Sequence, residues 1–364
     1  MMLRSAKAPM TPEPVFNPEM LTLARQAHEF TQEDLAERAE ISQVRISRIE
    51  HGLVQPNDQE VDRLAAALEY PRDFFFQVGH NYAPPVRMHR KRASLSQKVL
   101  NRIHAEINIR TLQIRQLLQG ATFDPELPLR HLDPEEYEGR IEDVARAVRS
   151  AWQVPRGPIV NIVRLMERAG IIIVPMRFGV PGFDAMTHLV PQLPPLVFIN
   201  EESPMDRLRF TLAHELGHLV MHVFPTPTME QEANRFAAEF LTPRAELEPQ
   251  MQRVSLPILA ALKAVWKVSM ASLLEQAKRF GIVTDRQYVR LRTELSKLGY
   301  LKREPENLDV QREHPQLLFR IVDYYRNQLK FGVNELSAVI RDYPDRVREN
   351  FFNEPKPKLS LVIA

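Results

Sequence analysis

Cysteine is absent from the 364 residues of this chain, and its absence limits the kinds of site that the chain can build. Without thiols there is no disulfide and no thiolate metal ligand, so a metal ion would have to be held by histidine, aspartate or glutamate. The absence also agrees with a reducing compartment. Any metal chemistry is therefore expected among imidazoles and carboxylates.

Long apolar runs and a strong charge of one sign are missing as well. No window approaches 18 apolar residues, so no membrane-spanning helix is predicted. The opening residues, MMLRSAKAPMTPEPV, lack the apolar core of a signal peptide. The net charge of +2 is too small to indicate a nucleic-acid partner by itself. We therefore predict a cytoplasmic protein in which any DNA-binding surface is local.

Proline is abundant, with 29 residues that mark boundaries between segments of a chain too long for one typical domain. The runs IIIVPM and PLVFIN predict short strands, whereas helical patterns dominate elsewhere. We predict a mostly α protein with a small β-sheet, of the α+β class. The expected divisions are a flexible tail at 1–15, an all-α domain at 16–80, a basic helical linker at 81–135, a central domain at 136–250 and a helical region at 251–364.

The stretch TQEDLAERAEISQVRISRIEHG predicts two short helices joined by a turn. Thr31 can cap the first helix, with Asp34 three residues later in the capping-box position. Ser42 can cap the second helix. The residues expected to face inward from the second helix are Val44, Ile46 and Ile49. Two short helices joined in this way match a DNA-binding helix–turn–helix, and a helical module that binds protein is the alternative.

The same residues resemble the Xre/Cro-like repressor family over about residues 17–75. The resemblance implies that the first helix of the pair approaches the DNA backbone and that the second enters the major groove. Glutamine and arginine suit this role, because each can bond bidentately to adenine or guanine. The residues implied to meet DNA are Gln32, Gln43, Arg45, Ser47 and Arg48.

Two further features bear on DNA binding. Glu40 stands where the family usually has a turn glycine, and glutamate takes a positive φ less readily than glycine does. Glu40 also adds negative charge near the DNA, so both of its properties weaken the expected affinity. The basic run RMHRKR at 87–92 could neutralise phosphates, although charge runs are more often solvated surface.

The stretch FTLAHELGHLVMH contains the pattern HExxH, formed by His214, Glu215 and His218. Residues four apart share one face of a helix, so both imidazoles can reach the same ion. Zinc accepts imidazole nitrogens at about 2.0–2.1 Å. The glutamate between the histidines can take a proton from a water on the metal. The pattern therefore predicts a zinc site with Glu215 as general base.

The flanking residues predict that HExxH lies on a helix. Ser203 can serve as N-cap, with Pro204 at the first helical position and Asp206 two residues later. His222 lies eight residues beyond His214, which is about 12 Å along a helix axis. One ion cannot bridge that distance with short bonds, so the third ligand is expected elsewhere.

The segment MEQEANRFAAEFLTP offers the third ligand. Glu230 and Asn234 stand four residues apart, so Glu230 could bind the ion while Asn234 orients a histidine ring. Glu232 and Glu239 are the competing carboxylates, but neither is followed by a polar residue four positions later. A group that stabilises an oxyanion is also expected. His188 and His222 are conceivable for that role, without a pattern that supports either.

The stretches RFTLAHELGHLVMH and EQEANRFAAEFLTP, preceded by VFIN, together resemble the ImmA/IrrE metallopeptidase family over roughly 140–250. The resemblance implies a zincin-like domain in which His214, His218 and Glu230 bind Zn²⁺ and Glu215 is the general base. An Xre-like domain before such a peptidase is a familiar arrangement in the family. The family commonly has LLMP where this chain has FLTP, a difference that affects packing more than chemistry.

Residues 251–364 contain no constellation that indicates chemistry. Their first part resembles the helical segment that follows the peptidase core in that family. Aromatic residues in this region could anchor a protein interface, although aromatic residues more often belong to a core. They are Tyr288, Tyr300, Tyr324, Tyr325, Phe351 and Phe352.

The two resemblances imply a DNA-binding transcriptional regulator fused to a zinc-dependent, site-selective endopeptidase. The expected partners are double-stranded DNA that carries an operator and a protein substrate, such as an Xre-like repressor or a toxin or antitoxin encoded nearby. No membrane partner is expected, and a homodimer is an open alternative to a monomer. The alternative function is a non-proteolytic transcription factor or toxin–antitoxin component whose metallopeptidase fold acts as a sensor or scaffold.

Overall fold

The computed structural model describes residues 3–5, 15–79, 82, 95–180 and 183–352. These residues are mostly helical and form two small sheets, which confirms the predicted fold class. The chain divides into two compact units. The N-terminal unit comprises Met2–Asp124, Val190–Leu193 and Leu317–Ala364, and the central unit comprises Pro125–Leu189 and Pro194–Gln316.

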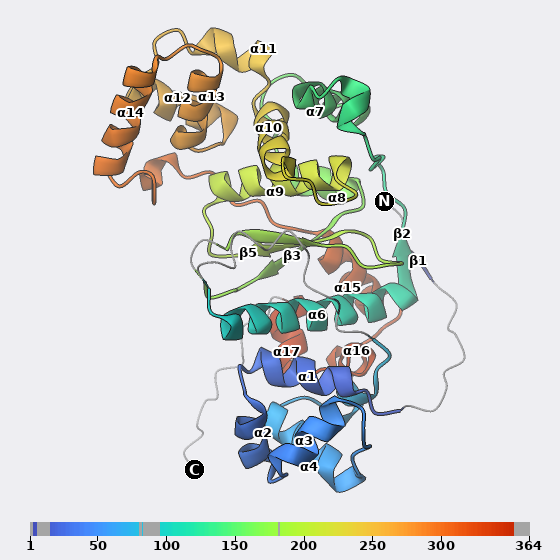
Figure 1. Ribbon diagram of the computed structural model, residues 1–364. Coiled ribbons are helices and arrows are strands. Elements are labelled where there is room, and N and C mark those ends of the chain that lie inside the picture. Colours follow the sequence, from blue (N-terminus) through green and yellow to red (C-terminus); the bar gives the residue numbers. More distant parts are fainter. Residues whose placement is uncertain (1–2, 6–14, 80–81, 83–94, 181–182, 353–364) are drawn as a thin grey trace, which may run out of the picture. The chain divides into compact units, whose positions relative to one another are not determined.

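The N-terminal unit is built almost entirely from helices (Figure 1). Its elements are β1 (Leu3–Ser5), α1 (Pro18–Ala27), α2 (Gln32–Ala39), α3 (Gln43–Glu50), α4 (Asp58–Leu68), η1 (Arg72–Phe76), α6 (Gln97–Gly120), β2 (Ala121–Phe123), α15 (Leu317–Asn327), α16 (Val333–Ile340), α17 (Pro344–Val347) and η6 (Arg348–Phe352).

The helix pair α2 and α3 begins and turns where the sequence predicted. Thr31 and Asp34 form a reciprocal capping box at the start of α2, and the Ser42 side chain accepts from the N–H of Arg45 at the start of α3. Between the two helices, Glu40 adopts the left-handed conformation with φ of 52°. A non-glycine residue holds this conformation only at a cost of about 1–2 kcal/mol. The turn therefore contains a left-handed residue at this position although it has glutamate there and not glycine.

The expected inward position of Val44 is wrong, because its side chain is 65% exposed. Ile46 and Ile49 are fully buried, as predicted. Side chains two positions apart on a helix are rotated by about 200° about the helix axis, so Val44 cannot share the face of Ile46. Val44 instead lies on the outer side of α3 with Gln43 and Arg48, which are also exposed.

The segment expected to be a basic linker contributes the long helix α6 to the N-terminal unit. Ala105, Ile109 and Leu112 of α6 belong to the same hydrophobic core as the helices α1 to α4. Residues 3–5, expected in a flexible tail, pair with 121–123 in an antiparallel ladder. The C-terminal helices α15 to α17 also belong to this unit rather than to one C-terminal region. The basic run at 87–92 lies outside the described residues.

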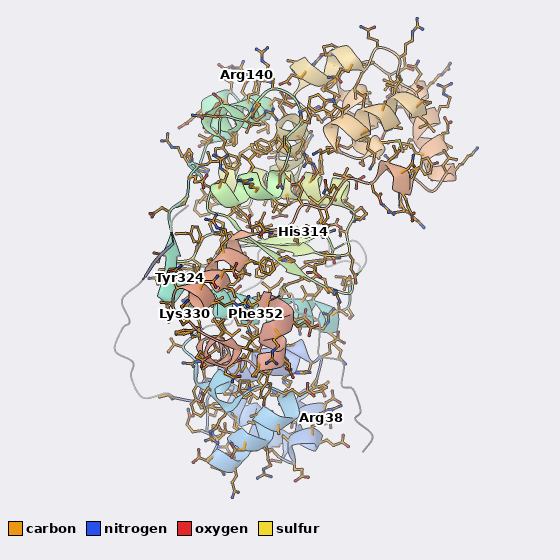
Figure 2. All side chains as sticks on the ribbon, turned by 180° about the vertical axis from the view of Figure 1, so that it is seen from behind. Arg38, Arg140, His314, Tyr324, Lys330 and Phe352 are labelled. Atoms are coloured by element: carbon orange, nitrogen blue, oxygen red, sulfur yellow. The ribbon has the colours of Figure 1, made fainter. Side chains whose placement is uncertain are left out.

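The aromatic residues near the C-terminus pack within the protein. Tyr325 and Phe351 are each 3% exposed, and the Tyr325 hydroxyl donates to the carbonyl oxygen of Leu117 at 2.7 Å. Tyr324 and Phe352, labelled in Figure 2, are half-buried. Burial of these rings favours a role in the core over a role as anchors of an exposed interface.

The central unit places one small sheet among helices. Its elements are η3 (Pro134–Tyr137), α7 (Ile141–Ala151), α8 (Ile162–Arg168), β3 (Ile172–Met176), β4 (Ala185–His188), β5 (Leu196–Asn200), α9 (Met205–Met221), α10 (Met229–Leu241), α11 (Arg244–Leu247), η4 (Glu248–Gln250), α12 (Leu256–Trp266), α13 (Met270–Arg279), α14 (Asp285–Lys297) and η5 (Glu306–Leu308).

The sheet of the central unit has the strand order β3-β5-β4. The middle strand β5 is parallel to β3 and antiparallel to β4, and all five of its side chains are buried. The helices α8 and α9 lie over one face of this sheet, and α10 crosses α9 on the far side from the strands (Figure 1). The helix that carries HExxH therefore lies against a sheet whose strand β4 is at the edge.

The start of α9 differs by one residue from the prediction. Pro204 is the N-cap, and the Ser203 hydroxyl donates to the Asp184 carboxylate at 2.7 Å instead of capping the helix. Further along α9, an added Cβ at Gly217 would come within 3.0 Å of the Phe236 side chain on α10. Glycine at this position therefore lets α10 pack closely against α9. These two helices carry the candidate metal ligands.

Within the described residues, no single helix is long and apolar enough to cross a membrane. Only α12 and α13 taken together reach the required length and apolarity, and the axes of these two helices are bent by 106° relative to each other.

Candidate functional site

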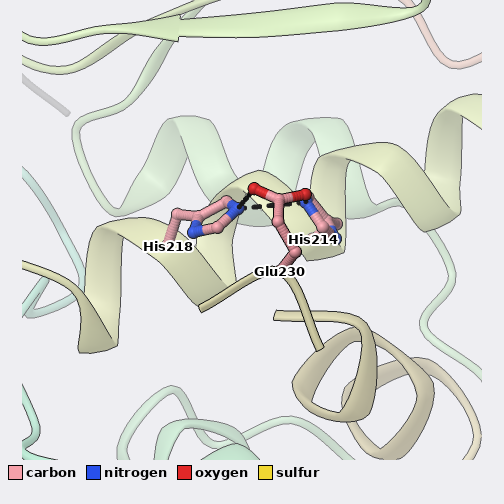
Figure 3. A group of neighbouring side chains, drawn as sticks. All are labelled: His214, His218 and Glu230. Carbon is pink, nitrogen blue, oxygen red and sulfur yellow. Dashed lines mark hydrogen bonds and ion pairs between the residues drawn. The ribbon is translucent and has the colours of Figure 1, made fainter. Parts of the chain in front are cut away.

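His214, His218 and Glu230 converge between α9 and α10, with their donor atoms all within 4.8 Å of one another (Figure 3). The Nε2 atoms of the two histidines are 3.0 Å apart. One carboxylate oxygen of Glu230 lies 3.3 Å from His218 Nε2, and the other lies 3.6 Å from His214 Nε2. The structure therefore brings together the three residues that the sequence pointed to as ligands.

These distances place the three donor groups within reach of one metal ion. Ligand atoms bonded at about 2.0–2.1 Å in tetrahedral geometry lie about 3.3 Å from each other. The two ring nitrogens are 3.0 Å apart, close to that value, and the distances of 3.3 and 3.6 Å to Glu230 are to different oxygens of its carboxylate. Two imidazole nitrogens and one carboxylate also form a common donor set of catalytic zinc sites, which leave the fourth position for water or substrate.

The competing carboxylates make contacts elsewhere. Glu232 lies 2.9 Å from His222 Nε2. Glu239 is 1% exposed and accepts hydrogen bonds from the Arg146 guanidinium and from the N–H of Arg244. Because both acids are engaged in this way, Glu230 is the carboxylate that the structure offers to the histidine pair.

The outer nitrogen of each ligand ring has a partner. His214 Nδ1 is 3.0 Å from the Asn234 side-chain oxygen, which places Asn234 where the sequence expected it. His218 Nδ1 is 2.9 Å from the Nδ1 of His222. Both rings therefore direct Nε2 toward Glu230 and Nδ1 toward a side chain that fixes their orientation. The spacing of four residues makes His218 and His222 neighbours on a helix, but the spacing alone does not show that their rings share a hydrogen bond.

Glu215 is oriented by a residue of the edge strand. Its Oε2 accepts from the Thr187 backbone N–H at 3.2 Å and from the Thr187 hydroxyl at 2.5 Å. Thr187 belongs to β4, 28 positions before Glu215 in the chain. No local pattern marks Thr187, so only the packing of α9 on the sheet reveals this contact. The two hydrogen bonds fix the orientation of the carboxylate of Glu215, the residue that follows His214 on α9.

His188 is not suited to stabilise an oxyanion at this site. Successive side chains of a strand point to opposite faces, and Thr187 points to the face covered by α9. His188 therefore points away from Glu215. Its side chain is 3% exposed, and burial lowers its pKa from 6.5 to about 4.

Burial of His188 predicts a loss of stability in acid. The unfolded chain takes up a proton at this histidine below pH 6.5, whereas the folded chain does so only near pH 4. The free energy of unfolding should therefore fall as the pH drops from 6.5 to 4, by about 3 kcal/mol from this group. Urea denaturation across that range, for wild type and His188→Leu without metal, measures the effect. An equal pH dependence of the free energy of unfolding in the two proteins would contradict this role of His188.

A cavity of about 890 Å³ lies next to the N-terminal half of α9, and neither ligand histidine nor Glu230 lines it. Phe210 and Thr211 of α9 line it, together with Asn234 and Arg235 of α10 and Tyr300. Asn234 connects the cavity to the site, because the same side chain contacts His214. A cavity of this size, with both apolar and polar walls, can take a segment of peptide.

In the N-terminal unit, Gln32 and Gln43 form a linked pair. The Gln43 amide donates to the Gln32 side-chain oxygen at 2.8 Å, and the Gln32 amide donates to Glu50 at 2.7 Å. Gln43 is exposed, and Gln32 and Ser47 are half-buried. The structure therefore brings the first residues of α2 and α3 together on one surface.

The two arginines of α3 have different surroundings. Arg45 donates to both carboxylate oxygens of Glu60 at 2.9 Å and to the Gln55 carbonyl at 2.9 Å. These hydrogen bonds lower the pKa of Glu60, so the pair stays ionised. Arg48 is exposed. Of the two residues, Arg48 is therefore the one whose guanidinium is better placed to meet DNA.

The comparisons with known proteins agree with this arrangement. Residues 166–278 match the model of the M78 peptidase family, described as an IrrE N-terminal-like domain, and residues 21–75 match a helix-turn-helix model. The three ligand candidates lie within the first match, and the residues implied to meet DNA lie within the second. Comparison with curated proteins gives no match. The M78 family indicates metallopeptidase activity and a metal ion, generally zinc. The chain therefore joins an Xre/Cro-like helix–turn–helix DNA-binding domain to an ImmA/IrrE-like peptidase domain of the M78 family.

Proposed function

We propose that this DNA-binding regulator uses its peptidase domain to cleave one specific regulatory protein, a repressor or an antitoxin-like partner, in a zinc-dependent reaction. The observation that carries the proposal is the convergence of His214, His218 and Glu230, whose donor atoms lie within 4.8 Å of one another, with Glu215, on the same helix as the two histidines, oriented by Thr187. The coupling to a DNA-binding domain supports a substrate that is itself involved in regulation.

Each residue of the site has a role in this reaction. When bound, zinc lowers the pKa of a coordinated water and polarises the scissile carbonyl. Glu215 takes the proton of the attacking water and passes it to the leaving amine. Thr187 holds the Glu215 carboxylate in place through its N–H and its hydroxyl.

The surroundings of the site suit an extended peptide. β4 is one of the two edge strands of its sheet, and an edge can bind a peptide through main-chain hydrogen bonds. Asp184, just before β4, lines the same cavity as Asn234. A substrate peptide that pairs with β4 and passes Glu215 would therefore place in the cavity the side chains on one side of its scissile bond.

Cleavage of a proteome-derived peptide library by the zinc-loaded protein tests this function. We expect new termini, identified by mass spectrometry, to cluster around one sequence motif and to disappear with a chelator. Zinc binding without any cleavage would contradict the peptidase and favour the sensor or scaffold function instead.

The DNA-binding role predicts different effects for the two arginines of α3. Arg48→Ala should weaken binding to a duplex selected by the wild-type chain by about 1–3 kcal/mol, as expected for loss of a base contact. Arg45→Ala should weaken it less, because Glu60 and Gln55 hold the Arg45 guanidinium. Fluorescence anisotropy at one fixed salt concentration measures both. A larger loss for Arg45→Ala than for Arg48→Ala would contradict the assignment.

A further inference from the structure

We propose that His222 and Glu232 position the ring of His218 for metal binding, through a chain of hydrogen bonds that runs from α10 back to α9. This role rests on the proposed metal centre and adds two positioning residues to it. Among the described residues, the group of donor atoms that could hold the ion is His214, His218 and Glu230, so His222 and Glu232 are outside it.

The geometry of the three side chains is continuous. His222 is the C-cap of α9, and its backbone N–H donates to the carbonyl oxygen of His218 at 3.0 Å. Its Nδ1 lies 2.9 Å from His218 Nδ1, and its Nε2 lies 2.9 Å from the Glu232 carboxylate. The side chains of His218 and His222 are 1% and 3% exposed. Water therefore has little access to the contact between the two rings.

Metal binding by His218 selects one arrangement of protons in this chain. The ion must take Nε2, because that atom faces His214 and Glu230. A neutral imidazole carries one N–H, so Nδ1 of His218 is then the donor and Nδ1 of His222 is the acceptor. The single N–H of His222 must in turn lie on Nε2, where it donates to Glu232. In this arrangement each nitrogen of His218 and His222 either binds the ion, donates or accepts, and the Glu232 carboxylate accepts.

The two ligand histidines are supported by different chemistry. His214 has the neutral amide of Asn234 behind its Nδ1, whereas His218 has an imidazole backed by the Glu232 carboxylate. A carboxylate behind a ligating histidine fixes the ring and makes its metal-bound nitrogen more basic. Glu230 and Glu232 lie in the first turn of the same helix, so α10 supplies both a ligand and the end of the positioning chain.

Zinc affinity tests the proposal directly, by competition with a chromophoric chelator. Phenylalanine in place of His222 keeps a ring of similar size but removes the acceptor for His218. We expect His222→Phe to weaken zinc binding by about 10–100-fold, the usual effect of losing such a partner. We expect a smaller loss for Glu232→Gln, because its amide oxygen can still accept from His222 but carries no charge. Val223→Ala, at the exposed neighbouring residue, is the matched control and should bind zinc as wild type does.

Two further measurements separate positioning from general stability. The melting temperature of each metal-free variant shows whether the fold is intact, and Glu232→Gln keeps the test available if His222→Phe does not fold. Imidazole ¹⁵N NMR of the zinc-loaded protein should show His222 protonated at Nε2 and not at Nδ1. Equal zinc affinity in wild type and in folded His222→Phe and Glu232→Gln would overturn the positioning role alone. A wild-type chain that binds no zinc would overturn the metal centre, and this proposal with it.

Discussion

Replacing Glu215 by glutamine is expected to lower peptide cleavage by about 10²–10⁴-fold, the usual contribution of a general base. The glutamine side chain has nearly the same shape and can still accept the hydrogen bonds from Thr187 through its carbonyl oxygen. It cannot take a proton from water at neutral pH. The rate of cleavage of a peptide identified from the library measures the effect.

The zinc content of the Glu215→Gln protein is the control for that experiment. Glu215 is not among the three residues that converge as ligands, so the variant should bind zinc as tightly as wild type. Thr187→Val, which removes the hydroxyl but keeps the backbone N–H, should cause a smaller loss of activity. If Glu215→Gln retained wild-type activity, the proposed role of the carboxylate would be wrong.

The second large effect is expected on stability, at a buried ion pair that holds α9. Arg209 is fully buried, and its guanidinium contacts the Glu313 carboxylate and donates to the Ile159 carbonyl at 2.6 Å. Glu313 also accepts from the N–H of Val163 at 3.1 Å. Arg209→Met leaves the carboxylate buried without its cation, which should lower the free energy of unfolding by about 3–5 kcal/mol.

Urea denaturation of Arg209→Met and of the double variant Arg209→Met/Glu313→Gln measures this coupling. The double variant should recover part of the lost stability, because it removes the unpaired charge as well. Arg177→Met, at a pair between Arg177 and Glu201 that is mostly exposed, is a suitable control and should change stability by less than about 1 kcal/mol. A loss of similar size in Arg177→Met and Arg209→Met would contradict the special role of the buried pair.

The parts of the site that follow from local periodicity could be predicted from the sequence. HExxH places His214 and His218 on one face of a helix, and the same spacing links Glu230 to Asn234. The structure brings all four side chains together. The caps at Thr31 and Ser42 are equally local, because each joins residues three apart.

The contacts that depend on packing could not be predicted in this way. Thr187 reaches Glu215 only because β4 forms the sheet edge next to α9. Glu60 reaches Arg45 from the following helix, and no spacing rule connects the two residues. The contact between His218 and His222 has the right spacing for neighbours on a helix, but a search for metal ligands alone overlooks hydrogen bonds between rings.

Domain boundaries were harder to predict because they depend on long-range packing. α6 lies in the segment predicted as a basic helical linker, yet it packs into the same core as the helix–turn–helix. Residues 317–352 join that unit although they come directly after the central unit in the chain. Gln113 of α6 donates to the buried Asp342 carboxylate at 2.9 Å, a contact between residues 229 positions apart.

The zinc content of the purified protein after dialysis tests the central claim most directly. We predict about one zinc ion per chain for wild type, as expected for a catalytic site with three protein ligands. His214→Ala and Glu230→Ala should lose most of that zinc, while Glu239→Gln, which changes a carboxylate paired with Arg146, should keep it. Equal zinc content in wild type and His214→Ala, or none in wild type, would contradict the metal centre.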